Sequence, residues 1–153
     1  VFFLDEGYKA EVIKSCLNSK SFNPNVIFSK IKNLTKFLNT KKGRNFMKAF
    51  KRLNSIADNT ESNYEFDHSL LKQREEIELF ESIKRFKNNK GINSLKIDEV
   101  CYEKISCAIN NFLDNIMVNA KEKMLRINRK LLLAKCKKVL SANFNFSTLQ
   151  IDD

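Results

Sequence analysis

The residues best suited to binding chemistry in this sequence are two arginines and an asparagine near its C-terminal end. Arg126 and Arg129 stand three positions apart, so they share one side of a helix, and Asn128 offers an amide within the same turn. The planar guanidinium of arginine can hold a phosphate through two hydrogen bonds or stack on a base. These residues therefore predict contacts to a nucleic acid. In the structural alternative, an arginine pairs instead with Asp114, with Glu122 or with an acidic helix.

A second basic region lies earlier in the chain. No Asp or Glu occurs from Val12 to Ala57, whereas eleven Lys or Arg do, and an ordinary surface would mix both signs. The densest part of this stretch, which also contains Lys48, supplies the other candidate contacts to nucleic acid. These candidates are Lys41, Lys42, Arg44, Lys51 and Arg52. A solvated lysine face without a ligand is the alternative interpretation.

The composition favours a helical protein with a polyanionic partner. Lys and Arg number 28 against 18 acidic residues, which gives a formal net charge of +10 and favours nucleic acid as the partner. A lysine-rich proteome is the alternative cause of this excess. The 153 residues are 42% hydrophobic, enough for one domain with a core over 1–153. Three Gly and one Pro argue for long helices, so we expect an all-α bundle of about five to seven helices.

Several kinds of site have no recognisable motif here. The four cysteines form no C-x-x-C pair and His68 is the only histidine, so we expect no metal site and free thiols in a reducing cytoplasm. Glycine-rich phosphate loops and metalloprotease motifs do not occur, so we expect no catalytic residue and no cofactor in this chain. Apolar runs of about four residues predict no membrane span and no secretory signal. The start at Val1, without Met, suggests a fragment of a longer protein.

Helical periodicity predicts the elements that carry the first basic region. A short helix is expected to reach Leu17, and Asn23 can cap a second helix that begins at Pro24. Gly43 allows a turn before a third helix. The inner stripes of the second and third helices are expected at Ile27, Ile31, Leu34 and Leu38, then at Phe46, Ala49, Phe50, Leu53 and Ile56.

The region from Asp58 to Ser82 is acidic. We expect a polar loop over 58–63, then a helix capped by Asp67 or Ser69 with an inner stripe. That stripe is Leu70, Ile77, Phe80 and Ile83. Glutamates on this helix would repel phosphate, so we expect the helix to lie away from the nucleic-acid face. They are Glu75, Glu76 and Glu78.

The C-terminal third predicts two further helices. Ser94 or Asp98 can open the first, and Asn119 with Glu122 three positions later resembles a capping box for the second. A single long helix is the alternative, because no Gly or Pro lies at this joint. Inner positions are expected at Ile97, Val100, Cys101, Ile105, Ala108, Ile109, Phe112, Ile116, Ala120, Met124, Ile127, Leu131 and Ala134.

Four aromatic residues are less clearly internal than the others. An exposed ring can stack on an unpaired base, which is worth about 1–3 kcal/mol per base. The four are Phe28, Tyr64, Phe66 and Phe144. Core packing is the favoured interpretation for each of them.

Short motifs in this sequence resemble those of a known family. Phe112–Val118, then Leu125–Arg129 and Leu131–Leu133, resemble the F-F-D-x-V-M-V and L-R-x-N-R-L-x-L-L patterns of bacterial glycyl-tRNA synthetase beta subunits, in their C-terminal helical domain. Lys51–Ile56 is similar to the family's K-R-x-x-N-I motif with Ser for its Asn, and Asn145–Leu149 is similar to its closing D-F-S-x-L. The chain departs from the family at Lys130, where an apolar residue is usual, and in a joint over 120–123 that is not acidic.

The resemblance implies a fold and a function. It implies an all-α bundle like the anticodon-binding domain of arginyl-tRNA synthetases, and binding of the anticodon region of a glycine-accepting tRNA. It also implies a parent ligase that uses ATP and an alpha subunit, with no catalytic site in this part. A structural domain that docks an acidic partner subunit is the alternative function. Membrane-surface binding is a weaker one, because the sequence contains no Trp and its apolar stripes are needed for a core.

Overall fold

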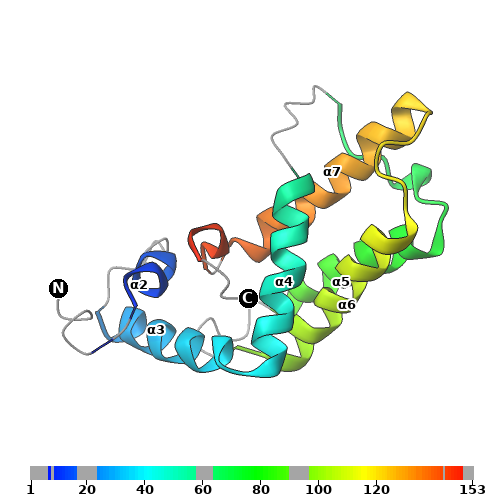
Figure 1. Cartoon of the computed structure of the whole chain (residues 1–153). Helices are drawn as coiled ribbons and strands as arrows, with labels where there is room; N and C mark the ends of the chain where they lie inside the picture. Colours follow the sequence, from blue (N-terminus) through cyan, green and yellow to red (C-terminus); the bar gives the residue numbers. More distant parts are fainter. Residues whose placement is uncertain are drawn as a thin grey trace.

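The protein is all-α throughout the part of the chain that the structure describes. The computed structural model describes residues 7, 9–16, 24–57, 64–89, 97–142 and 144–149, and none of these residues is in a strand. The α-helices and two short 3-10 helices in this part (Figure 1) are α2 (Ala10–Cys16), α3 (Pro24–Leu38), α4 (Lys41–Ile56), η1 (His68–Leu70), α5 (Arg74–Asn89), α6 (Glu99–Asn115), α7 (Lys123–Leu140) and η2 (Phe146–Thr148). The prediction of an all-α fold is therefore confirmed.

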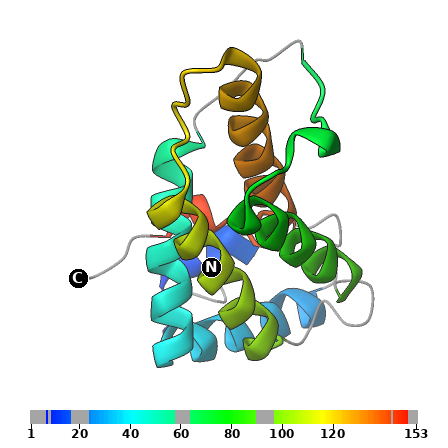
Figure 2. The ribbon, with the colours of Figure 1, turned by 90° about the vertical axis from the view of Figure 1, so that its right-hand side faces the viewer.

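Helix α4 stands at the centre of the arrangement. It packs against α3, α6, α7 and η2, while α6 also packs against α5 (Figure 1). The rotated view in Figure 2 shows α6 between α4 and α5. The acidic helix α5 and the basic helix α4 are therefore separated by α6.

The core is built from the inner faces of all the α-helices. Phe46 of α4 lies with its ring centroid 4.8 Å from Tyr102 of α6 and 4.9 Å from Phe146 of η2, and these pairs meet edge to face. Phe37 and Phe86 extend the same aromatic cluster around Tyr102. The stripes predicted for α3 and for most of α4 are buried as expected, namely Ile27, Ile31 and Leu34, then Phe46, Ala49, Phe50 and Leu53.

Other predicted inner positions are wrong. Ile56, Ile77, Val100 and Met124 are 40 to 53% exposed. On α5 Ile83 is buried as predicted, and the other buried hydrophobic positions are Leu79 and Phe86. On α7 the buried hydrophobic positions are instead Leu132, Leu133, Cys136 and Leu140. The prediction fails on α7 because the run of three leucines offers two apolar stripes about 100° apart on the helix. The core packs on the stripe that contains Leu132 and Cys136 and not on the one that contains Leu131.

Local signals explain several helix starts. Helix α3 begins at Pro24, and Asp98 caps α6 by accepting hydrogen bonds from the amides of Val100 and Cys101. Asp67 caps η1, not α5. The prediction that Gly43 marks a turn is wrong, because α4 begins at Lys41 after the capping side chain of Thr40. Gly43 serves a different need, since a Cβ atom there would collide with the carbonyl oxygen of Phe37 at the end of α3.

The joint between α6 and α7 confirms two helices in place of one. Helix α6 ends at Asn115, and α7 begins at Lys123 with Glu122 as its N-cap residue. The predicted capping box is wrong, because Asn119 lies in a turn and Glu122 makes no side-chain capping hydrogen bond. The connection instead depends on side chains from α7.

The thiols are free in the part of the chain described. Cys16 and Cys136 are buried, Cys101 is half-buried and Cys107 is exposed. Burial raises the pKa of Cys16 to about 12 and raises that of Cys136 further, so both remain protonated. None of the described helices combines the length and the apolar character that crossing a bilayer requires. The predicted loop over 58–63, the end of the first helix at Leu17 and the alternative cap Ser94 lie outside the described residues.

Candidate nucleic-acid interface

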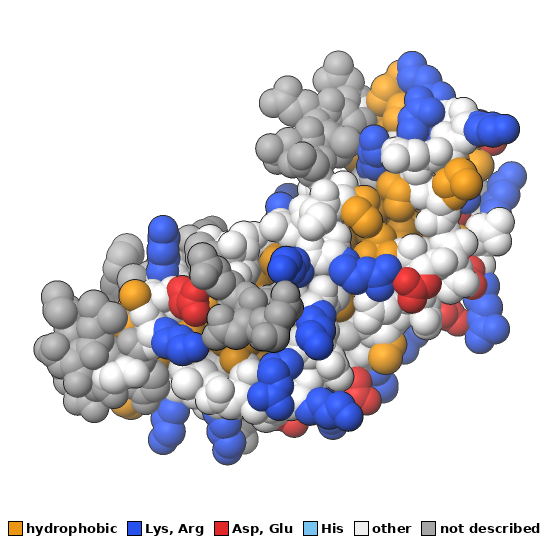
Figure 3. Space-filling view, viewed as in Figure 1, with side chains coloured by type: hydrophobic (Ala, Val, Ile, Leu, Met, Phe, Trp, Pro, Cys, Tyr) orange, Lys and Arg blue, Asp and Glu red, His pale blue; other side chains and the backbone are white. Residues whose placement is uncertain are grey.

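Helix α4 presents one face to the core and a basic face to solvent. Its buried positions are Gly43, Phe46, Met47, Ala49, Phe50 and Leu53. Lys41, Arg44, Lys48 and Lys51 recur at spacings of three and four on the opposite side, and all four are exposed. Figure 3 shows Lys and Arg side chains gathered along the course of α4. We call these four residues the α4 basic stripe.

The α4 basic stripe has no counter-charge in the described structure. None of its four residues forms an ion pair with a residue among those placed in 7–149. No acidic residue occurs on α4 itself, so no carboxylate lies one turn away. The stripe therefore projects an uncompensated positive field into solvent.

Two other candidates on α4 point toward α6 and are paired there. Lys42 lies 3.3 Å from Glu103, and Arg52 donates to Asn110 Oδ1 at 2.9 Å and to Asp114 Oδ1 at 2.8 Å. The side chains of both ion pairs are between 43 and 60% exposed, so each pair contributes little stability. An exposed pair of this kind can exchange its carboxylate for a phosphate at modest cost.

Arg129 does not face solvent, and its surroundings give no support to the predicted RNA contact, which stays a prediction. Its side chain is 10% exposed and lies on the buried face of α7. Nε and Nη2 donate to Oε1 of Glu76 at 2.9 and 2.8 Å, and Nη1 donates to the carbonyl of Met117 at 2.6 Å. Every nitrogen of the guanidinium is thus engaged inside the protein. The structural alternative, pairing with the acidic helix, holds for this residue.

Asn128 is also committed to the fold. It is 3% exposed, and its amide makes two hydrogen bonds with the backbone of Asp67. Asn128 Oδ1 accepts from the Asp67 amide at 2.8 Å, and Nδ2 donates to the Asp67 carbonyl at 3.0 Å. This side chain replaces backbone pairing for the segment that leads into η1, so its position gives no support to the predicted RNA contact, which stays a prediction as well.

Arg126 keeps part of its binding capacity. It is half-buried, and Nη1 donates to the carbonyl of Ala120 at 3.2 Å across the connection between α6 and α7. The structure gives Arg126 no ion pair with the residues it describes. Of the three residues predicted from α7, it is the one that can still reach a ligand.

The glutamates of α5 do not all behave as predicted. Glu78 pairs with Arg74 at the surface, at 2.8 Å, but Glu76 is 1% exposed and pairs with Arg129. Oε2 of Glu76 has no hydrogen-bond partner among the described residues. A buried carboxylate is costly unless a positive charge is buried beside it, which explains why Arg129 lies inside the protein next to Glu76.

The four aromatic candidates differ in exposure. Phe144 is 2% exposed and packs 5.6 Å from Phe146, so core packing is confirmed for it. Phe66 is half-buried and stacked on Phe80 at 5.5 Å, and Phe28 is half-buried on α3. Tyr64 is 44% exposed, with the amine of Lys123 5.8 Å from its ring. Tyr64 is the one ring of the four that is exposed.

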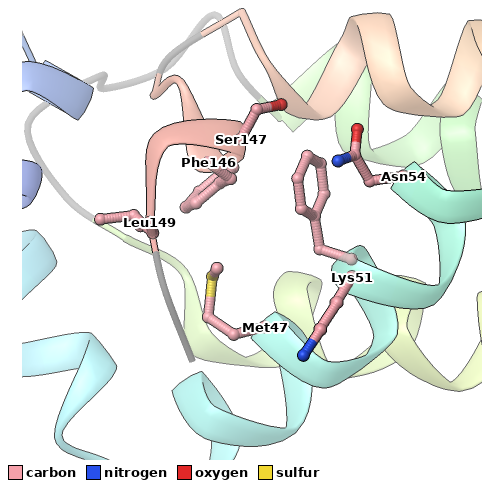
Figure 4. A pocket seen from close by; sticks show the side chains of 7 residues that line it. Met47, Lys51, Asn54, Phe146, Ser147 and Leu149 are labelled. Carbon is pink, nitrogen blue, oxygen red and sulfur yellow. The ribbon is translucent and has the colours of Figure 1, made fainter. Parts of the chain in front are cut away.

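A pocket of about 350 Å³ lies beside the α4 basic stripe, between α4 and η2. Its apolar lining is Met47, Phe50, Phe146 and Leu149. Lys51, Asn54 and Ser147 complete it, and Figure 4 shows Asn54 and Ser147 on one side of the opening with Lys51 running along the other. We call this the α4–η2 pocket. Sequence reasoning overlooked it because its two walls are distant in the chain, although both contain motifs quoted above.

Metal binding finds no support in the described residues. No group of three or more His, Cys, Asp or Glu residues among them lies close enough together to hold an ion. The ring of His68 packs edge to face on Phe80 at 4.9 Å. The interface is therefore described by charge, amides and apolar surface.

Comparison with known proteins gives a consistent result. A sequence model described as the DALR anticodon binding domain matches residues 46–150. The chain is 32% identical over 154 residues to the glycine–tRNA ligase beta subunit of Buchnera aphidicola subsp. Schizaphis graminum, and 30% identical over 155 residues to that of Salmonella typhi. Each alignment covers 97% of this chain and 22% of the relative. The chain thus spans about a fifth of the length of the curated relatives it matches.

Proposed function

The chain belongs to the DALR anticodon binding domain family, and we propose that it binds the anticodon region of a tRNA through the exposed face of α4. The α4 basic stripe carries this proposal. Four exposed cations without a carboxylate partner among the described residues, aligned over three turns, match the spaced phosphates of an RNA backbone. Lys42 and Arg52 flank the stripe and can join once phosphate replaces their acidic partners, and Arg126 is a further candidate on α7.

We further propose that the RNA is a glycine-accepting tRNA and that the chain is part of a glycine–tRNA ligase beta subunit. The names of the relatives support this assignment. In such a parent the domain would position the tRNA in the cytoplasm while ATP-dependent ligation takes place elsewhere, with an alpha subunit as partner. This chain would contribute binding only.

Measuring RNA binding over a salt series tests the proposal. The ligand is the anticodon stem-loop of a glycine tRNA, and an unrelated stem-loop serves for comparison. Each phosphate that a cation neutralises contributes about 0.7–0.9 to the slope of log affinity against log salt. The quadruple variant Lys41→Ala, Arg44→Ala, Lys48→Ala, Lys51→Ala should lose most of the slope and still melt like the wild type, because exposed charges add little stability.

Lys87→Ala is the matched control, since Lys87 is an exposed lysine on α5. Its slope should equal that of the wild type. The second candidate function, docking of an acidic protein subunit, uses the same stripe. Binding of the RNA with a salt slope near zero, or an equal loss of slope in Lys87→Ala, would contradict the tRNA proposal and favour that alternative.

A further inference from the structure

We propose that the α4–η2 pocket receives one unpaired nucleobase of the bound RNA. The inference rests on the proposed function and adds to it a specific subsite. Its first support is the pocket's position, because Lys51 belongs both to the pocket and to the α4 basic stripe. An RNA strand that follows the stripe from Lys41 toward the C-terminal end of α4 reaches the pocket at Lys51.

The lining suits a flat group that is apolar on its faces and polar at its edge. Met47, Phe50, Phe146 and Leu149 supply the apolar part, and the rings of Phe50 and Phe146 lie 5.6 Å apart. The volume of about 350 Å³ lies near the lower end of the range for small-molecule sites, about 300–1,000 Å³. A single base fits this description, whereas an inorganic phosphate would leave the apolar side chains without a partner.

The polar groups are placed for reading an edge. Asn54 offers both a donor and an acceptor, and Ser147 offers a hydroxyl that can serve as either. Neither side chain makes a hydrogen bond within the described part of the chain. Bases of single-stranded RNA loops are recognised through such edge contacts after they leave the stack. Lys51, on the other side of the opening, can take the phosphate of the same nucleotide.

Among the described residues, no acidic side chain lines the pocket. Asn54 stands next to a position where this chain departs from the family motif. In the stretch that resembles K-R-x-x-N-I, Ser55 stands where an Asn is usual. Ser55 donates to the carbonyl of Lys51 at 2.9 Å and is thus used within the helix. The neighbouring position carries the amide that faces the pocket. The described lining thus adds no negative charge that would repel the phosphate of a bound nucleotide.

Abasic substitution of the RNA tests the inference with the full 153-residue chain. Each nucleotide of the anticodon loop is replaced in turn by an abasic unit, and the dissociation constants are measured. Loss of one stacked base should weaken binding about 5- to 150-fold at one position of the loop. We call the dissociation constant of the abasic RNA divided by that of the intact RNA the abasic ratio. Asn54→Ala should reduce the abasic ratio at this position. Ser147→Trp, which fills the pocket from an exposed position, should bring the ratio to about one while the salt slope stays constant.

Lys48→Ala is the control, since Lys48 lies on the stripe but outside the pocket lining. It should lower the salt slope and keep the abasic ratio. If the wild type binds RNA with the expected slope but Asn54→Ala and Ser147→Trp keep the wild-type ratio at every position, the pocket inference is overturned and the proposed function stands. If the wild type binds no RNA, both are overturned. Thermal melting of each variant identifies effects of misfolding.

Discussion

Helices α4 and α7 carry almost the same density of positive charge and use it in opposite ways. Helix α4 has six Lys or Arg in 16 residues, and α7 has seven in 18. On α4 the ion pairs are exposed and four cations have no acidic partner among the described residues. On α7 the central arginine is buried against Glu76 and a backbone carbonyl. Charge density alone therefore does not identify a binding face. The position of the acidic residues on neighbouring helices decides which cations stay available.

The largest test of this contrast is removal of the buried pair on α7. Arg129→Ala should lower the free energy of unfolding by about 3–5 kcal/mol, because Glu76 would remain buried without a counter-charge. Urea denaturation measures the loss. Arg126→Ala on the same helix is the control and should cost about 1 kcal/mol or less. An Arg129→Ala protein as stable as the control would mean that Arg129 is not structural.

The next effect concerns the amide that holds the segment before η1. Asn128→Ala removes both hydrogen bonds to Asp67 and should cost about 1–3 kcal/mol. Hydrogen exchange should quicken at the amides of residues 67–71 before it quickens in α6. Asn128→Asp keeps the acceptor but buries a carboxylate opposite the Asp67 carbonyl, so its loss should be at least as large as that of Asn128→Ala. Equal exchange in the wild type and both variants would show that the Asn128 amide does not hold this segment.

A smaller effect is expected where α4 meets α6. Asp114→Asn removes the carboxylate that Arg52 holds at 2.8 Å in an exposed pair. Stability should change by less than about 1 kcal/mol. If Arg52 then turns to a phosphate, RNA affinity rises and the salt slope steepens by about 0.7–0.9. Isothermal calorimetry at two salt concentrations measures the RNA affinity and the salt slope. An unchanged slope would show that Arg52 keeps its contacts to α6 in the bound protein.

The smallest effect is a titration of Asp67, the residue whose backbone bonds to Asn128 of α7. Hydrogen bonds from the hydroxyl and amide of Ser69 lower the pKa of Asp67 below its usual value. A lowered pKa adds stability above the unfolded pKa of about 4, and that contribution is lost as pH falls through the folded value. Ser69→Ala should bring the pKa of Asp67 closer to its usual value, as NMR titration can measure. A pKa that does not move would assign the shift to another cause.

Signals that act over one helical turn are sufficient to predict much of the fold. Pro24 and the cap at Asp98 begin helices as their chemistry requires, and the stripes of α3 and α4 are buried as their spacing predicts. The five candidates on α4 also lie at the surface, where they were expected to be useful.

Contacts between distant segments are not predictable in this way. The pairing of Arg129 with Glu76 joins α7 to α5, and i to i+3 spacing can only say that Arg126 and Arg129 share a side. The α4–η2 pocket has the same character, because Phe146 and Phe50 lie far apart in the chain and meet only in the folded structure. Sequence reasoning can name both partners of such a contact without joining them.

Because Gly43 has no side chain, the first turn of α4 packs directly on the end of α3, and this contact sets the direction of α4. At 16 residues α4 is about 24 Å long, with the contact to Phe37 near one end and Asn54 near the other. A methyl group at Gly43 would push α4 away from α3 and tilt its axis. The displacement that a small tilt causes increases along the helix. The relative position of the two pocket walls, several turns away, therefore depends on the absence of a Cβ atom at residue 43. Relatives with any other residue at this position would need a differently angled α3.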